Sequence, residues 1–361
     1  MQRQVTVTPA RWWHLAGLSS LIRESRRRRG AASEDGYTGR GGQPIVWAPR
    51  WSPSLALLQS VWSASVPGVR VPLSYVAELQ EPGGRRRPIG LGQIRPKREP
   101  HQWEVAYLAV DFPAEASRLR LVPDRNASRL LGALCDAAIA QRADRLLARV
   151  SDSGGGYELF RQLGFSLAVR EYTYFRTLTE NGPAAGDAAL LAQRVPGLRP
   201  QRRADPHGLL QLYERATPKT VQLVEGKRSA SWDFAPVGLG RRLARRVGVQ
   251  RWVVERETQK VGWLQIQRAG RGPHQVSILV DERDAELNQS LVDFALDVLG
   301  SAGAANDNAG VMVRAREHQT RLIAALDASQ FLLVDAQLLM AKMLATPVLQ
   351  PQFGRVLEKV V

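Results

Sequence analysis

Few of the side chains that usually carry out chemistry are grouped in this sequence. The histidines are scattered, at His14, His101, His207, His274 and His318. Cys135 is the one cysteine, so no segment has metal-ligand spacing and we expect no metal site. Cys135 falls beside Leu131 and Leu134 on the apolar side of a predicted helix, with no histidine close in sequence to activate it, which indicates a core thiol.

One glycine run and several arginine clusters suggest binding of phosphate, but each has a simpler interpretation. Gly154-Gly155-Gly156 lacks the Lys-Ser/Thr of a P-loop, which favours a flexible connection. The 50 Lys and Arg exceed the 34 Asp and Glu by 16, and the clusters 26–29 and 241–246 could attract nucleic acid. Nearly all of this charge is arginine, which a GC-rich genome also produces, so nucleic-acid binding is possible but not favoured.

The composition indicates a folded, two-domain protein. Hydrophobic residues make up 44% of the 361 residues and charged residues 23%, which is close to the globular average. No run approaches the roughly 18 to 20 apolar residues of a membrane-spanning helix, and the N-terminus lacks the apolar core of a signal peptide. We therefore expect a soluble, cytoplasmic protein.

An internal repeat organises the chain. Segment 89–94 reads like segment 261–266, and each precedes a second strand-like run, at 105–110 and at 276–280. An apolar helical stripe, a further strand and a short helix follow in both halves. The offset between matching features stays near roughly 160 to 172 residues, as expected for a duplicated domain.

This order of elements predicts the α/β (α+β) class, with two tandem domains that each have a mixed, mostly antiparallel sheet flanked by helices. We place the first domain at 1–181, with an irregular insertion at about 30–53. A Pro/Gly-rich linker follows at 182–195 and the second domain at 196–361. The apolar residues after Trp12, which precede Arg26–Arg29, predict a first helix rather than a membrane-surface helix.

The stretch from Trp103 to Arg176 resembles the GCN5-related N-acetyltransferase (GNAT) superfamily. The matching pieces are the strand Glu104–Val110, the loop and helix from Val122 to Leu131, and the string from Tyr157 to Gly164-Phe165. The second half resembles the family more weakly, through 261–280, 291–299 and 318–331. The resemblance implies a tandem GNAT protein.

The resemblance implies an acyl-CoA site in the first half. A strand that splays from its neighbour exposes backbone groups to which the pantetheine amides can pair, and Leu108, Ala109 and Val110 would do this. The pyrophosphate would lie at the start of the following helix, where backbone N–H groups and the helix dipole favour an anion. The residues implied there are Arg125, Asn126, Ala127, Ser128 and Arg129.

The phosphate loops depart from the family pattern Q/R-x-x-G-x-G/A. In the first half Val122, Arg125 and Ala127 take the three fixed positions, and only Ala127 conforms. In the second half Arg283, Glu286 and Asn288 take these positions, and a carboxylate beside a pyrophosphate is repulsive. We therefore expect the first half to bind acyl-CoA more readily than the second.

The resemblance also implies direct attack of an amine on the thioester, with a general base and a tyrosine that protonates the leaving thiolate. Glu104 is the candidate base, although a solvated outward position is the alternative. Phe160 and Leu326 stand where the tyrosine is often found, so Tyr157 is the candidate acid. Tyr172 and Tyr174 are further candidates.

These observations lead to one functional hypothesis and one alternative. We expect an acyl-CoA-dependent N-acyltransferase that moves an acetyl group from acetyl-CoA to a small-molecule or peptide amine in its N-terminal domain, with a mainly structural C-terminal domain. The alternative is a non-catalytic GNAT-fold binding protein with decayed cofactor sites. The sequence leaves the acceptor and the oligomeric state open.

Overall fold

The computed structural model of the chain describes residues 5–14, 71–81, 84, 86–97, 99, 101–110, 125–152, 156–178, 192–233, 248–269, 272–300 and 310–344. The insertion predicted at about 30–53 and most of the predicted linker lie outside these residues. Of the predicted first helix, Trp12–His14 forms one 3-10 turn, η1, after a strand, and residues 15–22 lie outside the described part.

The N-terminal half contains six strands and two α-helices in the described residues. They are β1 (Val5–Pro9), β2 (Leu73–Gln80), β3 (Arg86–Pro96), β4 (Gln102–Val110), α3 (Arg125–Ala140), β5 (Arg145–Ser151), α4 (Gly156–Gln162) and β6 (Ser166–Thr177).

The C-terminal half repeats this order and adds a helical pair after its first strand. Its elements are β7 (Leu198–Pro200), α6 (Pro206–Ala216), α7 (Lys219–Glu225), η3 (Ser229–Trp232), β8 (Val249–Arg256), β9 (Gln259–Gln267), β10 (His274–Val280), η4 (Glu282–Asp284), α9 (Leu287–Gly300), β11 (Gly310–Arg316), α10 (Thr320–Ala328) and β12 (Leu332–Met343).

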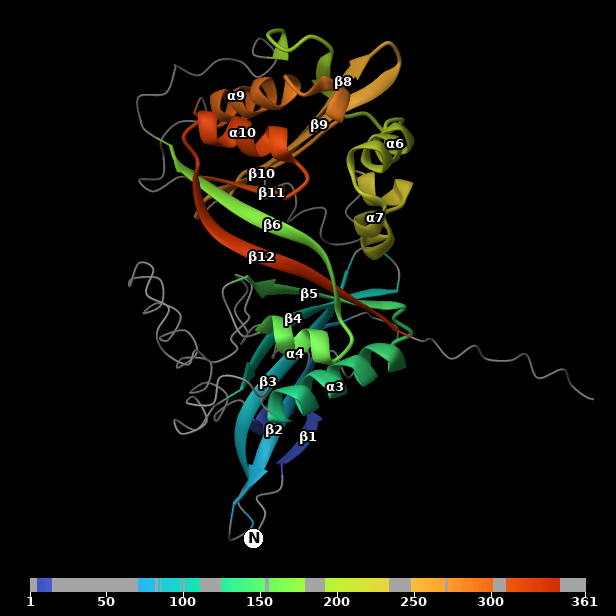
Figure 1. Cartoon of the computed structure of the whole chain (residues 1–361), viewed down its shortest axis with the longest axis vertical. Helices are drawn as coiled ribbons and strands as arrows, with labels where there is room; N and C mark the ends of the chain where they lie inside the picture. Colours follow the sequence, from blue (N-terminus) through green and yellow to red (C-terminus); the bar gives the residue numbers. More distant parts are fainter. Residues whose placement is uncertain are drawn as a thin grey trace, which may run out of the picture.

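The two halves share one sheet because they exchange their last strands. The order of the 12 strands is β1-β2-β3-β4-β5-β12-β6-β11-β10-β9-β8-β7. Thus β12 lies between β5 and β6, and β6 lies between β12 and β11. Figure 1 shows β6 and β12 running side by side across the middle of the molecule, with α3 and α4 at one end and α9 and α10 at the other. The mixed, mostly antiparallel sheet with flanking helices confirms the predicted fold class.

The helices cover the sheet on two faces. Leu338 of β12 packs in the core under α3 and α4, while Tyr172 of β6 packs against the core under α9 and α10. Leu338 lies opposite Arg170, two residues before Tyr172, so both cores lie on the same face. On the opposite face, Val221 of α7 packs on Val169 and Leu339.

Glycines in the repeated strand segments allow the helices to approach the sheet. A Cβ atom on Gly90 of β3 would lie 3.3 Å from Leu130 of α3, and one on the aligned Gly262 of β9 would lie 2.7 Å from Leu287 of α9. The glycines that first revealed the repeat therefore serve the same packing role in each half.

The strand exchange predicts that both halves unfold together. Met340 of β12 is completely buried in the core of the N-terminal half. Replacing Met340 with Ala should lower the free energy of unfolding by about 2–5 kcal/mol. Urea unfolding followed by circular dichroism should show one shifted transition. Met343→Ala, on the same strand but 62% exposed, should change stability by less than about 0.5 kcal/mol. Two separate transitions, with only one shifted, would contradict the exchange.

Candidate functional site

Strands β4 and β5 open into a notch. They pair in parallel only where Gln102–Glu104 face Arg145–Leu147, and the described residues show no pairing between them beyond that point. The register of β4 against β3 shifts just there, since Val105 faces Ile94 and Tyr107 faces Gln93, which leaves Ala106 as an extra residue. A bulge of this kind bends its strand. We call residues 105–110 and 148–151 the N-terminal notch.

The predicted cofactor strand lines this notch. Leu108, Ala109 and Val110 lie at the end of β4, with side chains at most 4% exposed. On one side their backbone pairs with β3, and the other side faces the opening. This edge, which no described strand covers, is of the kind that accepts an extended, amide-containing ligand.

The predicted phosphate-binding residues form the first turn of α3, which begins at Arg125. Arg125 is exposed and has no hydrogen-bond or ion-pair partner among the described residues, whereas Asn126 and Ser128 are half-buried. Ala127 is fully buried in the core, so a bulky residue there would disrupt packing directly. Arg129 donates a 3.3 Å hydrogen bond to the Val5 carbonyl of β1. Within the described part of the chain, Arg125 is therefore an unpaired cation at the start of α3.

Glu104 lies at the apex of the notch in a cluster of cations. It is 1% exposed, which rules out the solvated position considered from the sequence. Arg95 lies 2.7 Å from its carboxylate, Lys97 lies 3.9 Å away, and Arg149 also hydrogen-bonds to it. Burial alone would raise the pKa of Glu104, but these three cations lower it below its ordinary value. The group is an ionised carboxylate at neutral pH.

The candidate tyrosines separate into two places. Tyr157, in the first turn of α4, is half-buried against the core under α3 and α4. Phe160 is 1% exposed and meets Phe165 edge to face, with ring centroids 5.0 Å apart. Tyr172 and Tyr174 instead belong to the core of the C-terminal half, because β6 is exchanged into it. Tyr172 and Tyr174 therefore do not lie near Tyr157, although their closeness in sequence suggested that they would.

The C-terminal half has an equivalent notch that a side chain bridges. Among the residues that the structure describes, β10 and β11 pair in parallel only where His274–Val276 face Val311–Val313. The Gln319 amide then spans the opening: its oxygen accepts from the Arg316 backbone N–H at 3.0 Å, and its nitrogen donates to the Ile278 carbonyl at 3.4 Å. Gln319 immediately precedes α10, whereas the residues before α4 in the other half are glycines. The C-terminal notch is thus closed by the protein itself.

The loop after β10 is acidic, and some of its polar side chains are hydrogen-bonded within the loop or paired with α6. Asp281 accepts from the Arg283 backbone N–H at 3.2 Å and pairs with Arg215 at 2.8 Å. Asn288 is buried and donates to the Ala285 carbonyl at 3.0 Å. Glu286 adds a further carboxylate just before α9. This arrangement offers a pyrophosphate little favourable charge.

A chain of buried charges, which sequence reasoning missed, crosses the sheet on the α7 face. Arg149 joins Glu104 to Glu171, at 2.6 Å from the latter. Arg316 lies 3.5 Å from Glu171 and also pairs with Glu225 at the end of α7. The chain ends in an aromatic corner, where Glu225 accepts a 2.8 Å hydrogen bond from Tyr213 and lies 3.5 Å from Lys227, whose ammonium sits over the rings of Tyr213 and Trp232.

The one sequence signal for this chain is a charged residue inside an otherwise apolar strand. Glu104, Arg149 and Glu171 each interrupt such a strand. A lone buried charge requires a partner, but the pattern does not say which one.

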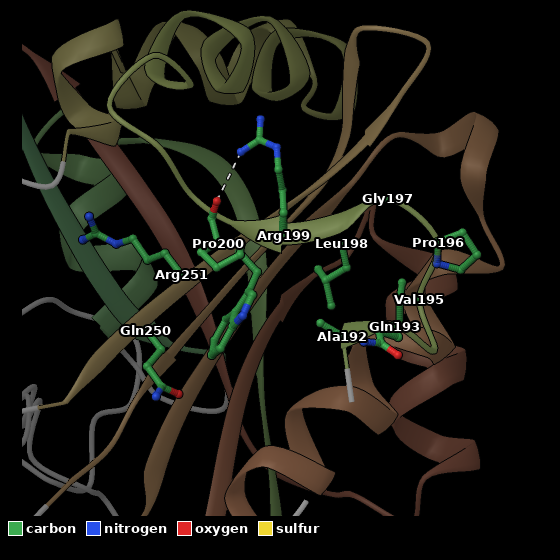
Figure 2. A pocket seen from close by; sticks show the side chains of 11 residues that line it. Ala192, Gln193, Val195, Pro196, Gly197, Leu198, Arg199, Pro200, Gln250 and Arg251 are labelled. Atoms are coloured by element: carbon green, nitrogen blue, oxygen red, sulfur yellow. Dashed lines mark hydrogen bonds between the residues drawn. The ribbon is translucent and has the colours of Figure 1, made fainter. Parts of the chain in front are cut away.

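A pocket of about 580 Å³ lies elsewhere, at the outer edge of the sheet beside β7 and β8. Figure 2 shows Leu198 and Arg199 lining it, with an Arg199 hydrogen bond to the Pro200 carbonyl. The Arg199 guanidinium is already paired with Asp205 at 2.8 Å and Glu255 at 2.6 Å. None of the predicted site residues lies in this pocket.

Two further properties concern the described residues only. No group of three or more His, Cys, Asp and Glu side chains is arranged there to hold a metal ion. Within the same part of the chain, none of the helices has the length and apolar character needed to span a bilayer.

Comparison with solved structures identifies the fold. One similar structure is a GCN5-related N-acetyltransferase from Sphaerobacter thermophilus, with a TM-score of 0.51 and 13% sequence identity. The match covers 95% of this chain and 97% of the other chain. A GCN5-related glucosamine N-acetyltransferase region of a fungal multi-domain GH3 β-N-acetylglucosaminidase matches 95% of this chain over 38% of its own, with a TM-score of 0.55 and 9% identity. No family model and no curated protein matches the chain.

The chain therefore has the GNAT fold. The two halves repeat the same order of strands and helices, so it is a tandem GNAT-fold protein, as the sequence predicted.

The charge chain predicts an acid-sensitive fold. Burial raises the pKa of Glu171, but Arg149, Arg316 and Arg314 outweigh it and lower the pKa from about 4.5 to about 2. In the unfolded chain Glu171 has its ordinary, higher pKa, so unfolding favours protonation of its carboxylate. The stabilisation of the fold by ionised Glu171 is therefore complete above about pH 5 and is lost as the pH falls toward 2. Urea midpoints measured from pH 6 to pH 2.5 should fall less steeply for Glu171→Gln than for wild type.

The matched control for this measurement is Glu257→Gln, in an exposed turn, which should keep the wild-type slope. Equal slopes for Glu171→Gln and wild type would show that Glu171 is not held ionised in the native state.

Proposed function

We propose that the protein is an acyl-CoA-dependent N-acyltransferase whose N-terminal notch binds acetyl-CoA. The observation that carries this proposal is the contrast between the two notches: one has a bulged, free β4 edge, and Gln319 bridges the other. The GNAT fold adds support, since the solved structures that share it are described as N-acetyltransferases.

The residues of the N-terminal notch fit the parts of acetyl-CoA. The backbone of Leu108, Ala109 and Val110 pairs with the pantetheine amides as an added strand. The first turn of α3, with the free guanidinium of Arg125, holds the pyrophosphate through backbone N–H groups, the helix dipole and charge. Bound in this way, acetyl-CoA supplies an activated thioester for attack by an amine.

Glu104 and Tyr157 remain the proposed catalytic groups. Glu104 is the carboxylate at the apex, and its role is to take the amine proton directly or through water. Its three cationic partners weaken it as a base, so its stronger effect is to attract and orient the cationic amine before deprotonation. Tyr157, in the first turn of α4, is the proposed proton donor to the leaving thiolate.

The proposed role of the C-terminal half is mainly structural. It provides β12, without which β5 and β6 have no partner between them, and α7, which contacts the base of the notch. There the Gln102 side chain donates to the Glu225 carbonyl, and Arg145 donates to the Leu223 carbonyl. The N-terminal notch is thus held by residues of both halves.

Isothermal titration calorimetry with acetyl-CoA tests the proposal. Wild type should bind about one equivalent. Arg125→Glu should weaken binding about tenfold, or about 1.4 kcal/mol, because it places a carboxylate beside the pyrophosphate. Arg142→Glu, just beyond the other end of α3, changes the net charge equally and should bind like wild type.

Absence of binding by folded wild-type protein would contradict the proposal and favour the alternative, a non-catalytic GNAT-fold binding protein. Equal weakening by Arg125→Glu and Arg142→Glu would show that net charge, rather than the start of α3, attracts the ligand.

A further inference from the structure

Arg314 is an unpaired cation beside the buried charge chain. It lies in β11, two residues before Arg316, so both side chains are on the α7 face of the sheet. Its side chain is exposed, and it has no hydrogen-bond or ion-pair partner among the described residues.

The repeat shows what Arg314 lacks. Its counterpart in the other half is Arg149. Arg149 lies two residues after Leu147, which faces Glu104 of β4. Arg314 lies two residues after Met312, which faces Gln275 of β10, so Gln275 stands where the other half has Glu104.

The second carboxylate around Arg149 has also been replaced. Glu171 of β6 lies directly opposite Gln337 of β12. Each follows the aligned phenylalanine of its half, Phe165 or Phe331, by six residues, so the two occupy equivalent positions in the repeat. The two carboxylates around Arg149, Glu104 and Glu171, therefore correspond to two glutamines around Arg314.

The nearby carboxylates are already used. Glu104 pairs with Arg95, Lys97 and Arg149. Glu171 pairs with Arg149 and Arg316, and Glu225 pairs with Arg316 and Lys227. Three carboxylates thus serve five cations before Arg314 is counted.

The surroundings of Arg314 favour an anion. Burial by neighbouring groups and the like charges of Arg149 and Arg316 lower its pKa, and they outweigh the attraction of Glu171 and Glu104, which raises it. A guanidinium remains charged under these conditions and binds a carboxylate through two parallel hydrogen bonds. A small carboxylate would therefore relieve repulsion that the protein itself leaves in place.

We propose that Arg314 binds the carboxylate of the amine acceptor, so that the acceptor is an amino-acid-like molecule. The inference rests on the proposed function of the N-terminal notch. Glu104 of β4 and Arg314 of β11 lie on the same face, and the backbones of these two strands are four strand spacings apart, or roughly 19 Å. Side chains reach inward from both, so a short carbon chain separates the amine from the carboxylate.

The test compares acceptors that differ only in the carboxylate. Glycine, β-alanine, 4-aminobutanoate and 6-aminohexanoate are each assayed with acetyl-CoA against the corresponding amino amide. The acids should be preferred, with an optimum at one chain length. Arg314→Gln should raise the KM for the best acid about tenfold or more and leave its KM for the amide and the Kd for acetyl-CoA unchanged. Arg314→Lys should recover part of the loss.

Arg321→Gln is the matched control, since it removes an exposed arginine from α10 on the opposite face. It should behave as wild type. Calorimetry of the acids with wild type and Arg314→Gln, without acetyl-CoA, gives a readout that does not need turnover.

The outcomes separate the two proposals. Loss of acetyl-CoA binding by wild type overturns the proposed function, whatever Arg314 does. If acetyl-CoA binds, an equal rate for acids and amides, or an unchanged KM in Arg314→Gln, overturns the carboxylate site. If the acids bind in a way that needs Arg314 but do not compete with the acceptor that is being acetylated, Arg314 belongs to a separate effector site. That result would also overturn the acceptor assignment.

Discussion

The exchange of β6 and β12 is the constraint on which the rest of this structure depends. Each strand fills a gap in the sheet of the other half, so neither half has a complete sheet alone. The exchange also places Tyr172 and Tyr174 in the distant core and brings Glu171 to a position between Arg149 and Arg316. The buried charge chain, which joins the apex of the N-terminal notch to α7, is a direct result.

The two notches differ in how their backbone groups are satisfied. In the N-terminal half, β4 has a bulge at Ala106, and the described residues show no strand paired with its second edge beyond Glu104. In the C-terminal half, β10 runs without a bulge and Gln319 satisfies the backbone groups that a ligand would otherwise meet. An unpaired backbone group inside a protein is costly, so the side chain that bridges the C-terminal notch stabilises it without a ligand.

Much of the fold was predictable because it depends on local patterns. The glycine-containing segments at 89–94 and 261–266 revealed the repeat, and the apolar stripe at Leu130, Leu131 and Leu134 is the buried side of α3. The strand exchange was not predictable in this way, because a strand pattern does not state its partner. The roles of Gln319 and Arg314 depend on that pairing, and both look like ordinary polar residues in the sequence.

The most direct test of a single ligand-binding notch is amide hydrogen exchange, measured by mass spectrometry with and without saturating acetyl-CoA. Peptides that span 105–110 and the first turn of α3 should exchange more slowly with the ligand, because the β4 edge and the helix start become hydrogen-bonded. Peptides that span 277–280 should not change. Protection at 277–280, or at neither strand, would contradict the account.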